Sequence, residues 1–562
     1  MSDDHGEAGA NPSPEAIPAR GEGGARGLLA QLRELWAPLR DHPRLGLLAL
    51  ALLCTFAYFV GPPAWNQNSR LALTRALVEK GQVHIDPWEV TTGDKSFRDG
   101  HFYSDKAPGV SLLSALPYAL FVAERRLTGG ELPEVRVIPL DPGASAAGTV
   151  PAPEDRLPGD ALAYNPAQQT ALWLCRMVAI SLPTLIVAGL FYLLMLAEFG
   201  RLRWATWATL IWLLATPALG YSCGLYGHQL AACCLFGAFA LTVLSAPEHR
   251  APEAGWGMPV LVGTCLGWAV LAEYTAAVPV LVLVAWSLWR RGLRFALGVC
   301  AGGVPWAVLL AGYHTWAFGS PLKTGYDFVY LEEFAEGMKV AYGLGWPNPA
   351  VAVQLLFGSY RGLFYLSPVL LLAAWGLGVC LWHARAPSEP NADASSGEAG
   401  VLLRGDWLVC VLVGLWYLGL NSGYYMWDGG AALGPRHMVP MLPFLALGLG
   451  PPLARLPRAT LVLAGIACIQ MILITAAGPE APGHGNPVWA YAVPEIRVAQ
   501  LPPGSATTLG RLMGLPGPLS LLPLIALWAL IWPFDQDERE GGDAGAGTPA
   551  TDFRASGADL DA

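Results

Sequence analysis

The apolar stretch Thr170-ALWLCRMVAISLPTLIVAGLFYLLMLAE-Phe199 decides the class of fold. It contains two charged residues, Arg176 and Glu198, and it exceeds the roughly 20 residues that an α-helix needs to cross a bilayer core. Comparable runs recur from about Leu45 to about Pro533. We count roughly 12 or 13 of them, with boundaries that pattern alone places only to within a few residues. The sequence therefore predicts an all-α, polytopic membrane protein whose membrane domain covers residues 45–533.

Composition points the same way. Hydrophobic residues make up 54% of the chain and charged residues 14%, whereas about a quarter of a soluble domain is charged. The net charge is −9, and eight acids against two arginines in the tail 534–562 supply −6 of it. The membrane domain is therefore nearly neutral, and no nucleic-acid partner is expected. Both the acidic tail 534–562 and the polar segment 1–24 are predicted to be disordered, because they have too little apolar surface to bury.

Basic residues in short connections predict the orientation. Residues 25–44 form a basic segment before the first apolar run, so the positive-inside rule places the N-terminus in the cytoplasm. Arginines recur in alternate connections between the later apolar runs, and the same rule places those connections inside. The remaining connections, which hold most of the Trp, Tyr and His side chains, are then outside. The predicted external loops are 62–108, 313–349, 421–437 and 478–511.

One part of this topology stays open. A simple second span over 109–123 ends at Arg125 and Arg126, apparently inside, yet the count from the far end requires the span that finishes near Glu198 to begin outside. Either 130–167 contains a re-entrant piece, or the run 170–199, interrupted at Pro183, is not one simple helix.

The first external loop is predicted to carry a short interfacial helix. Ser69 can cap it, Leu73 and Leu77 share an apolar face, and Gly81 can end it. The rest of the loop is dense in charge and aromatic side chains.

Three carboxylates in this loop are candidate catalytic bases: Asp86, Asp94 and Asp105. A carboxylate at the lip of a membrane cavity can take a proton from an acceptor hydroxyl, while a neighbouring cation such as Lys106 neutralises a phosphate. The alternative is a solvated loop whose charges do nothing specific. Asp105-Lys106 is the stronger candidate, because Pro108 and Gly109 begin the next apolar run at once and leave the pair at the membrane boundary.

These residues resemble a known family. The segment Ser104-Asp105-Lys106-Ala107-Pro108 is similar to the acidic-Lys-Pro-Pro pattern that ends the first external loop of GT-C glycosyltransferases, the group of aminoarabinose transferases and protein O-mannosyltransferases. It matches at the acid, the Lys and the second Pro. The resemblance implies transfer of a sugar from a polyprenyl-phosphate donor at the outer face of a bacterial cytoplasmic membrane.

One departure from that family bears on the mechanism. Its members place an acid a few residues ahead of an Arg on the first loop helix, whereas Arg70 follows the amides Asn66-Gln67-Asn68. Amides cannot act as the base. That role must then pass to one of the three candidate carboxylates, or the chain is an inactive or differently working relative.

Later segments add candidates for binding. The stretches Tyr313–Tyr326 and Trp427–Pro440 are similar to bacterial membrane glycosyltransferases. Arg436, at a Gly-Pro turn, could hold a phosphate in bidentate fashion, or it could reach lipid headgroups as an interfacial Arg. The candidates for donor phosphate are Lys106, Arg361 and Arg436, and those for sugar or acceptor are Trp427, Asp428, Tyr313 and Glu273.

Two of these candidates are singled out by their surroundings. Glu273 and Arg361 are ionisable residues in apolar surroundings, where a charge is costly and usually has a partner. We expect each to face a cavity or an opposite charge, and a phosphate or Glu273 is the partner expected for Arg361.

No dedicated metal site is predicted, although the carboxylates could hold one divalent cation with help from a phosphate. The leading hypothesis is a glycosyltransferase that uses a polyprenyl-phosphate sugar and a lipid, glycan or protein acceptor. The alternatives are a lipid or solute transporter or flippase, for which Glu273 and Arg176 are the few mid-membrane polar residues, and a non-catalytic envelope-assembly protein.

Overall fold

The computed structural model describes residues 27–40, 43–61, 63–138, 161–246, 255–384, 400–478, 480–482, 485–498 and 507–531. Helices dominate these residues, and four short strands form two separate two-stranded sheets. The all-α prediction is confirmed. The predicted disordered ends, 1–24 and 534–562, lie outside the described residues.

The helices follow the predicted apolar runs. Those of the N-terminal quarter are α1 (Leu28–Leu35), α2 (Ala37–Arg40), α3 (Pro43–Tyr58), α4 (Trp65–Arg75) and α5 (Gly109–Thr128). The longer helices of the remainder are α6 (Pro166–Arg176), α7 (Leu182–Phe199), α8 (Leu202–Leu214), α10 (Gly227–Leu244), α11 (Gly257–Ala272), α12 (Ala277–Arg291), α13 (Leu293–Phe318), α15 (Pro349–Phe357), α17 (Val369–His383), α18 (Arg404–Gly423), α21 (Pro457–Ala477) and α24 (Leu522–Ile531). Short helices between them include α9 (Ala218–Ser222), α14 (Glu332–Met338), α16 (Leu363–Leu366), α19 (Leu442–Ala446), α20 (Gly450–Arg455), α22 (Val493–Arg497) and α23 (Leu509–Leu512).

Six helical segments of the described residues are long and apolar enough to cross a membrane: Pro166–Phe199, Gly227–Leu244, Leu293–Phe318, Arg404–Gly423, Arg436–Arg455 and Pro457–Ala477. Four shorter apolar segments accompany them: Arg44–Tyr58, Gly257–Ala272, Val369–His383 and Gly517–Ile531. The chain is a multi-pass membrane protein by these measures. The predicted total of 12 or 13 spans stays a prediction.

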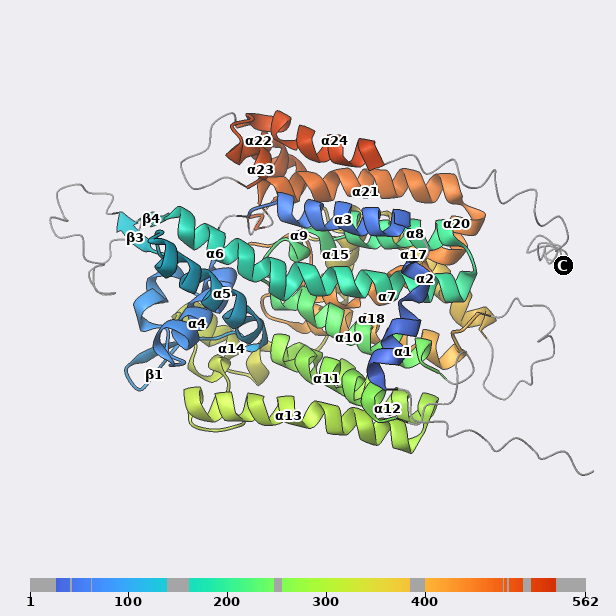
Figure 1. Cartoon of the computed structure of the whole chain (residues 1–562), viewed down its shortest axis with the longest axis horizontal. Coiled ribbons are helices and arrows are strands. Elements are labelled where there is room, and N and C mark those ends of the chain that lie inside the picture. Colours follow the sequence, from blue (N-terminus) through green and yellow to red (C-terminus); the bar gives the residue numbers. More distant parts are fainter. Residues whose placement is uncertain are drawn as a thin grey trace, which may run out of the picture.

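The long helices, such as α7, α13 and α21, run across the molecule from one end to the other, and the two ends differ (Figure 1). One end holds α4, α5 and the strands β1 (Lys95–Arg98), β3 (Val135–Ile138) and β4 (Ala161–Tyr164), whereas α1, α12 and α20 lie toward the other. Arg290, Arg291 and Arg455 sit in the last turns of α12 and α20. The helices that end in these arginines and the charged first loop thus lie toward different ends of the molecule, and the side of the membrane that each faces stays a prediction.

The structure describes the helices on either side of the open part of the topology. The segment 109–123 lies in α5, which is not among the helices apolar enough to span and stays at the end that holds α4 and β3 (Figure 1). The run 170–199 belongs to one continuous helix, Pro166–Phe199, in which a π-helical turn at Met177–Ser181 precedes Pro183. A proline lacks the N–H that a regular helix needs, and the π turn absorbs that break. The run 170–199 is thus part of one continuous helix with an internal π-helical turn, and the side of the membrane on which α6 begins stays a prediction.

The helix of the first loop also differs from its prediction. It runs over Trp65–Arg75 and continues as a π-helical turn, Ala76–Lys80, and it ends at Gly81, whose φ is +64° as an αL cap requires. Ser69 lies inside the helix rather than at its cap. Residues 66–75 are all buried, because the charged loop packs over them, so α4 is not a surface-lying interfacial helix.

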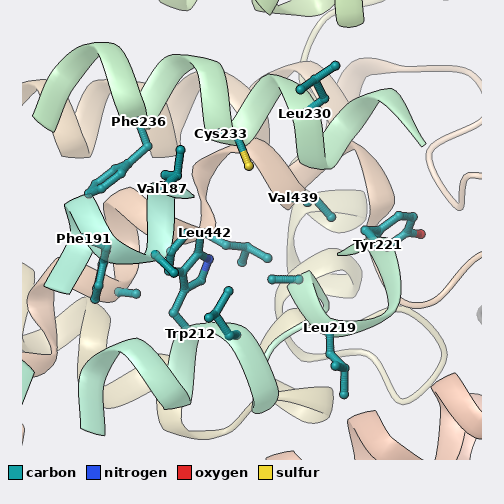
Figure 2. Close-up of a cluster of buried hydrophobic side chains, with 14 of the residues drawn as sticks. Val187, Phe191, Trp212, Leu219, Tyr221, Leu230, Cys233, Phe236, Val439 and Leu442 are labelled. Atoms are coloured by element: carbon teal, nitrogen blue, oxygen red, sulfur yellow. The ribbon is translucent and has the colours of Figure 1, made fainter. Parts of the chain in front are cut away.

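One part of the hydrophobic core lies among α7, α8, α10 and the segment 436–455 (Figure 2). Trp212 is fully buried there, with its ring centroid 5.0 Å from that of Phe191 and 6.2 Å from that of Phe236. Such packing matters inside a bilayer, because helices there associate through close van der Waals contact rather than through exclusion of water.

Replacing Trp212 by Ala removes these ring contacts and leaves a cavity, so we expect a loss of about 3–5 kcal/mol of stability. Thermal unfolding in detergent measures it as a lower Tm. Trp382, with 78% of its surface exposed, is the matched control, and Trp382→Ala should leave the Tm unchanged. Equal effects of the two substitutions would contradict this view of the core.

Candidate active site

A β-hairpin in the first loop brings two predicted carboxylates together. Strand β1 (Lys95–Arg98) pairs antiparallel with β2 (His101–Ser104), and Lys95 lies opposite Ser104. Asp94 directly precedes β1 and Asp105 directly follows β2, so both carboxylates emerge at the open end of the hairpin. Antiparallel pairing thus converts a sequence separation of eleven residues into neighbouring side chains.

Lys106 joins the two carboxylates. Its Nζ lies 3.1 Å from Asp94 Oδ2 and 3.1 Å from Asp105 Oδ2, and all three side chains are largely buried. Ser69 on α4 fixes the hairpin end, because its hydroxyl donates to the Asp94 carbonyl at 2.6 Å and lies 2.8 Å from Ser104 Oγ. The oxygen Asp105 Oδ1 is buried and has no hydrogen-bond partner among the described residues.

The two carboxylates ionise differently. Burial raises the pKa of Asp105 to about 6, and the negative charge of Asp94 adds to that rise against the opposing charge of Lys106. Burial also raises the pKa of Asp94, but Lys106, Arg436 and Arg70 together outweigh it and hold that pKa below its usual value. Burial lowers the pKa of Lys106, but the negative charges of Asp105 and Asp94 raise it by more, so the pKa of Lys106 lies above its usual value. One acid is thus held ionised while the other can exchange a proton near neutrality.

A second ion pair lies beside this group. Arg70 Nη2 on α4 is 2.8 Å from Glu273 Oε1, and its other nitrogens donate to Asn66 Oδ1 and to the Ala107 carbonyl, each at 3.2 Å. His228 Nδ1 lies 3.6 Å from the same Glu273 oxygen. Of the two partners expected for Arg361, a phosphate or Glu273, the structure excludes Glu273, because Glu273 pairs with Arg70. Arg70 thus has a carboxylate beside it, supplied by the residue that follows α11.

Two glycines allow these elements to meet. A Cβ on Gly109, the first residue of α5, would lie 2.6 Å from the Leu271 carbonyl oxygen. A Cβ on Gly227 would lie 2.3 Å from Glu273 Oε1. Both distances are far below van der Waals contact, so a larger residue at either position would separate α5 or α10 from the end of α11.

Arg436 is the one guanidinium of this group for which the described residues show no hydrogen bond or ion pair. Its Nε is buried without a partner, and its charge acts on Asp94 and on Lys106. Gly429, with φ +74°, lets the loop pass close by, since a Cβ there would lie 3.1 Å from Arg436 Cγ. The predicted phosphate ligand is therefore available for an anion.

The other predicted ligands form a neighbouring unit. Arg361 is 1% exposed and donates to the carbonyls of Gly430 and Ala432 and, at 3.2 Å, to that of Pro482. The Tyr360 hydroxyl donates to Asp428 Oδ2 at 3.1 Å, and the Tyr360 ring packs edge-on against Trp427. Arg361 thus holds the loop 428–432 beneath Arg436 with most of its donors already used.

Tyr313 and Asp86 have contrasting positions. Tyr313 is buried on α13, its hydroxyl has no partner among the described residues, and it is close enough to Asp105 to feel its charge. Asp86 binds elsewhere, to His84, His101 and the Phe102 N–H. Of the three predicted bases, the structure groups Asp94 and Asp105 and leaves Asp86 with other partners.

Some residues of the site were not predicted. Tyr226 donates to Glu480 Oε1 at 2.5 Å, and burial raises the pKa of Glu480 to about 7. His437 packs edge-on against His228, with centroids 5.1 Å apart, and against Tyr424 at 5.3 Å. Glu480 could have been identified as a candidate from the sequence, because it is an acid in the predicted external loop 478–511.

Comparison with known proteins gives structural neighbours only. No protein-family model matches the chain, and neither does any curated protein. Two crystal structures of ArnT from Cupriavidus metallidurans, apo and bound to undecaprenyl phosphate, align with TM-scores of 0.43 at 17% and 18% identity. They cover 88% and 86% of this chain and 75% and 74% of ArnT. The apo Archaeoglobus fulgidus oligosaccharyltransferase aligns at 0.38 and 12% identity, over 85% of this chain and 60% of that one. TM-scores below 0.5 do not establish a shared fold.

The Arg70–Glu273 pair generates a stability prediction. Glu273→Ala leaves a buried guanidinium without its carboxylate, and breaking a buried pair in this way costs about 3–5 kcal/mol. The double variant Arg70→Met, Glu273→Leu removes both charges and should be markedly more stable than Glu273→Ala alone. Thermal unfolding in detergent measures all three proteins, with Glu332→Ala, at an exposed position of α14, as control. A double variant that is no more stable than Glu273→Ala would contradict direct pairing.

Proposed function

We propose that this chain is a membrane glycosyltransferase that moves a sugar from a polyprenyl-phosphate donor to an acceptor hydroxyl or amine at the outer face of a bacterial cytoplasmic membrane. The observation that carries the proposal is that Asp105 Oδ1 and the Arg436 guanidinium both lack a hydrogen-bond partner among the described residues, while Lys106 binds Asp105 and lies within reach of the charge of Arg436. The resemblance of Asp105-Lys106-Ala107-Pro108 to GT-C enzymes supports the same reaction.

The cations suit the phosphate of the donor. Lys106 supplies a point charge and Arg436 a planar fork that can bind two phosphate oxygens at once. When the sugar–phosphate bond breaks, its electron pair leaves with the lipid phosphate and increases the negative charge there. Fixed cations in a partly buried site stabilise that charge without having to reorganise.

Asp105 suits the role of general base. The acceptor oxygen attacks the anomeric carbon while Asp105 Oδ1 takes its proton, so one C–O bond forms as the other breaks and configuration is inverted. A carboxylate with a pKa of about 6 is mostly ionised at neutral pH and is a stronger base than an ordinary Asp. Asp94, held ionised, keeps Lys106 charged and oriented.

The competing functions lose their main support. A transporter needs polar groups free along the membrane path, yet Arg176 donates to the carbonyls of Phe56 and Phe59, and Glu273 binds Arg70. A non-catalytic protein was favoured by the missing acid ahead of Arg70, and the presence of Asp105 beside Lys106 supplies another candidate base.

Asp105→Asn tests the proposal. The amide keeps the size of the side chain but cannot accept a proton, so turnover should fall by about 10²–10⁴. Membranes are assayed for conversion of their own polyprenyl-phosphate sugars to polyprenyl phosphate by mass spectrometry. Asp99→Asn is the matched control, because Asp99 lies in the turn of the same hairpin, is exposed and has φ +51°, which Asn adopts readily.

Full turnover in the Asp105→Asn protein would remove Asp105 from the mechanism. If membranes with and without the chain convert their polyprenyl-phosphate sugars equally, while proteoliposomes show substrate counterflow, the transporter function would replace the proposed one.

The ionisation of Asp105 also predicts a pH dependence. Because its pKa is raised to about 6 and the base must be deprotonated, turnover should rise as pH increases through about 6 and then level off. The residual turnover of the Asp105→Asn protein should not rise with pH in this range. A wild-type profile that is flat from pH 5 to pH 7 would contradict the assignment of the base.

A further inference from the structure

Three side chains outside the proposed active site converge on one point. His84 Nδ1 lies 2.8 Å and His101 Nδ1 lies 2.7 Å from the same oxygen, Asp86 Oδ2. The imidazole centroids are 4.4 Å apart, and the three ligand atoms all lie within 4.8 Å of one another.

The backbone holds this cluster in place. His84 forms a β-bridge with Tyr103, and the Ile85 N–H donates to the Phe102 carbonyl at 2.7 Å, which ties the segment before the 3₁₀ helix Asp86–Thr91 to strand β2. Asp86 Oδ1 accepts from the Phe102 N–H at 2.7 Å. One carboxylate oxygen is thus used by the backbone, and the other is left to both histidines.

The set of atoms suits a transition metal. Two imidazole nitrogens and one carboxylate oxygen are the ligands that Zn²⁺ prefers, and imidazole also suits Co²⁺ and Ni²⁺. In the absence of an ion, His101 Nδ1 must carry the proton of its hydrogen bond to Asp86 Oδ2, whereas His84 Nδ1 lies near both that oxygen and the Gln82 amide nitrogen. A bound ion takes the place of these contacts and binds all three ligand atoms together. The side chains are 29% (His84), 34% (Asp86) and 47% (His101) exposed, so water can reach a fourth position.

We propose that His84, Asp86 and His101 form a binding site for a divalent transition-metal ion, of which Zn²⁺ fits best. The site differs from the sequence prediction, which assigned no metal ligands and counted Asp86 as a catalytic base. Gln82, whose amide nitrogen lies 3.2 Å from His84 Nδ1, gives up that contact when the ion binds.

The ion has a structural role. His101 begins β2 and Asp105 follows its end, a separation of four residues or about 13 Å along a strand. An ion at this distance does not reach the reacting atoms. The ion links the 3₁₀ helix to the hairpin that is flanked by Asp94, Asp105 and Lys106. Its binding should therefore stabilise the first loop.

Metal stoichiometry tests the proposal. The purified full chain in detergent, freed of any polyhistidine tag and stripped with a chelator, is titrated with ZnCl₂ by calorimetry. We expect the wild type to bind one zinc ion per chain. The variants His84→Ala and Asp86→Asn should bind none, whereas His383→Ala, at the end of α17, should still bind one. Zinc should also raise the Tm of the wild type and of His383→Ala but not that of the first two variants.

His101→Cys guards against a simple folding defect. A thiolate can replace the imidazole as a zinc ligand, so this variant should still bind one zinc ion per chain. X-ray absorption at the zinc edge should then show one Zn–S distance of about 2.3 Å. No bound zinc in the wild type, the same stoichiometry in all variants, or a zinc spectrum unchanged by His101→Cys would each overturn the proposal. None of these results depends on glycosyl transfer.

Discussion

The ion group around Lys106 is the interaction on which the rest of this structure depends. Charges removed from water at a membrane boundary are costly, and each must find compensation nearby. Lys106 finds it in Asp94 and Asp105, which a two-stranded hairpin brings to the same point, and Arg70 finds it in Glu273. α4, α5, the hairpin and the end of α11 are held together by these pairs, with Gly109 and Gly227 permitting the close approach.

Two charged groups beside this ion group lack a partner among the described residues, and these are the ones that chemistry can use. The Arg436 guanidinium has no partner among the described residues, and neither has Asp105 Oδ1. A free cation and a free carboxylate oxygen beside a paired lysine are what a phosphate-bearing donor and a hydroxyl acceptor require. Arg361 shows the contrasting case, because backbone carbonyls occupy its terminal nitrogens and it supports the loop instead.

The sequence predicted what depends on local pattern. Apolar runs gave the helical membrane class, and Asp105-Lys106 was identified because Pro108 and Gly109 fix it at the start of an apolar run. Pairing between distant segments was not predictable. Arg70 and Glu273 are 203 positions apart, and only the tertiary structure, in which α5 packs against both α4 and α11, shows that the two side chains form an ion pair. Asp86 and Asp94 looked equivalent as loop acids, yet hairpin register directs Asp94 to Lys106 and leaves Asp86 with histidines. Ser69 resembled a helix cap, but the buried hairpin extends the helix to Trp65.

The central claim is that Lys106 and Arg436 hold the phosphate of a lipid-linked donor beside Asp105. A cryo-electron microscopy structure of the full chain with bound polyprenyl phosphate tests it most directly. The account predicts the phosphate within hydrogen-bond distance of Lys106 Nζ and of the Arg436 guanidinium, with Asp105 Oδ1 open toward it. A phosphate bound elsewhere, with Arg436 and Lys106 making no contact to it, would contradict the account.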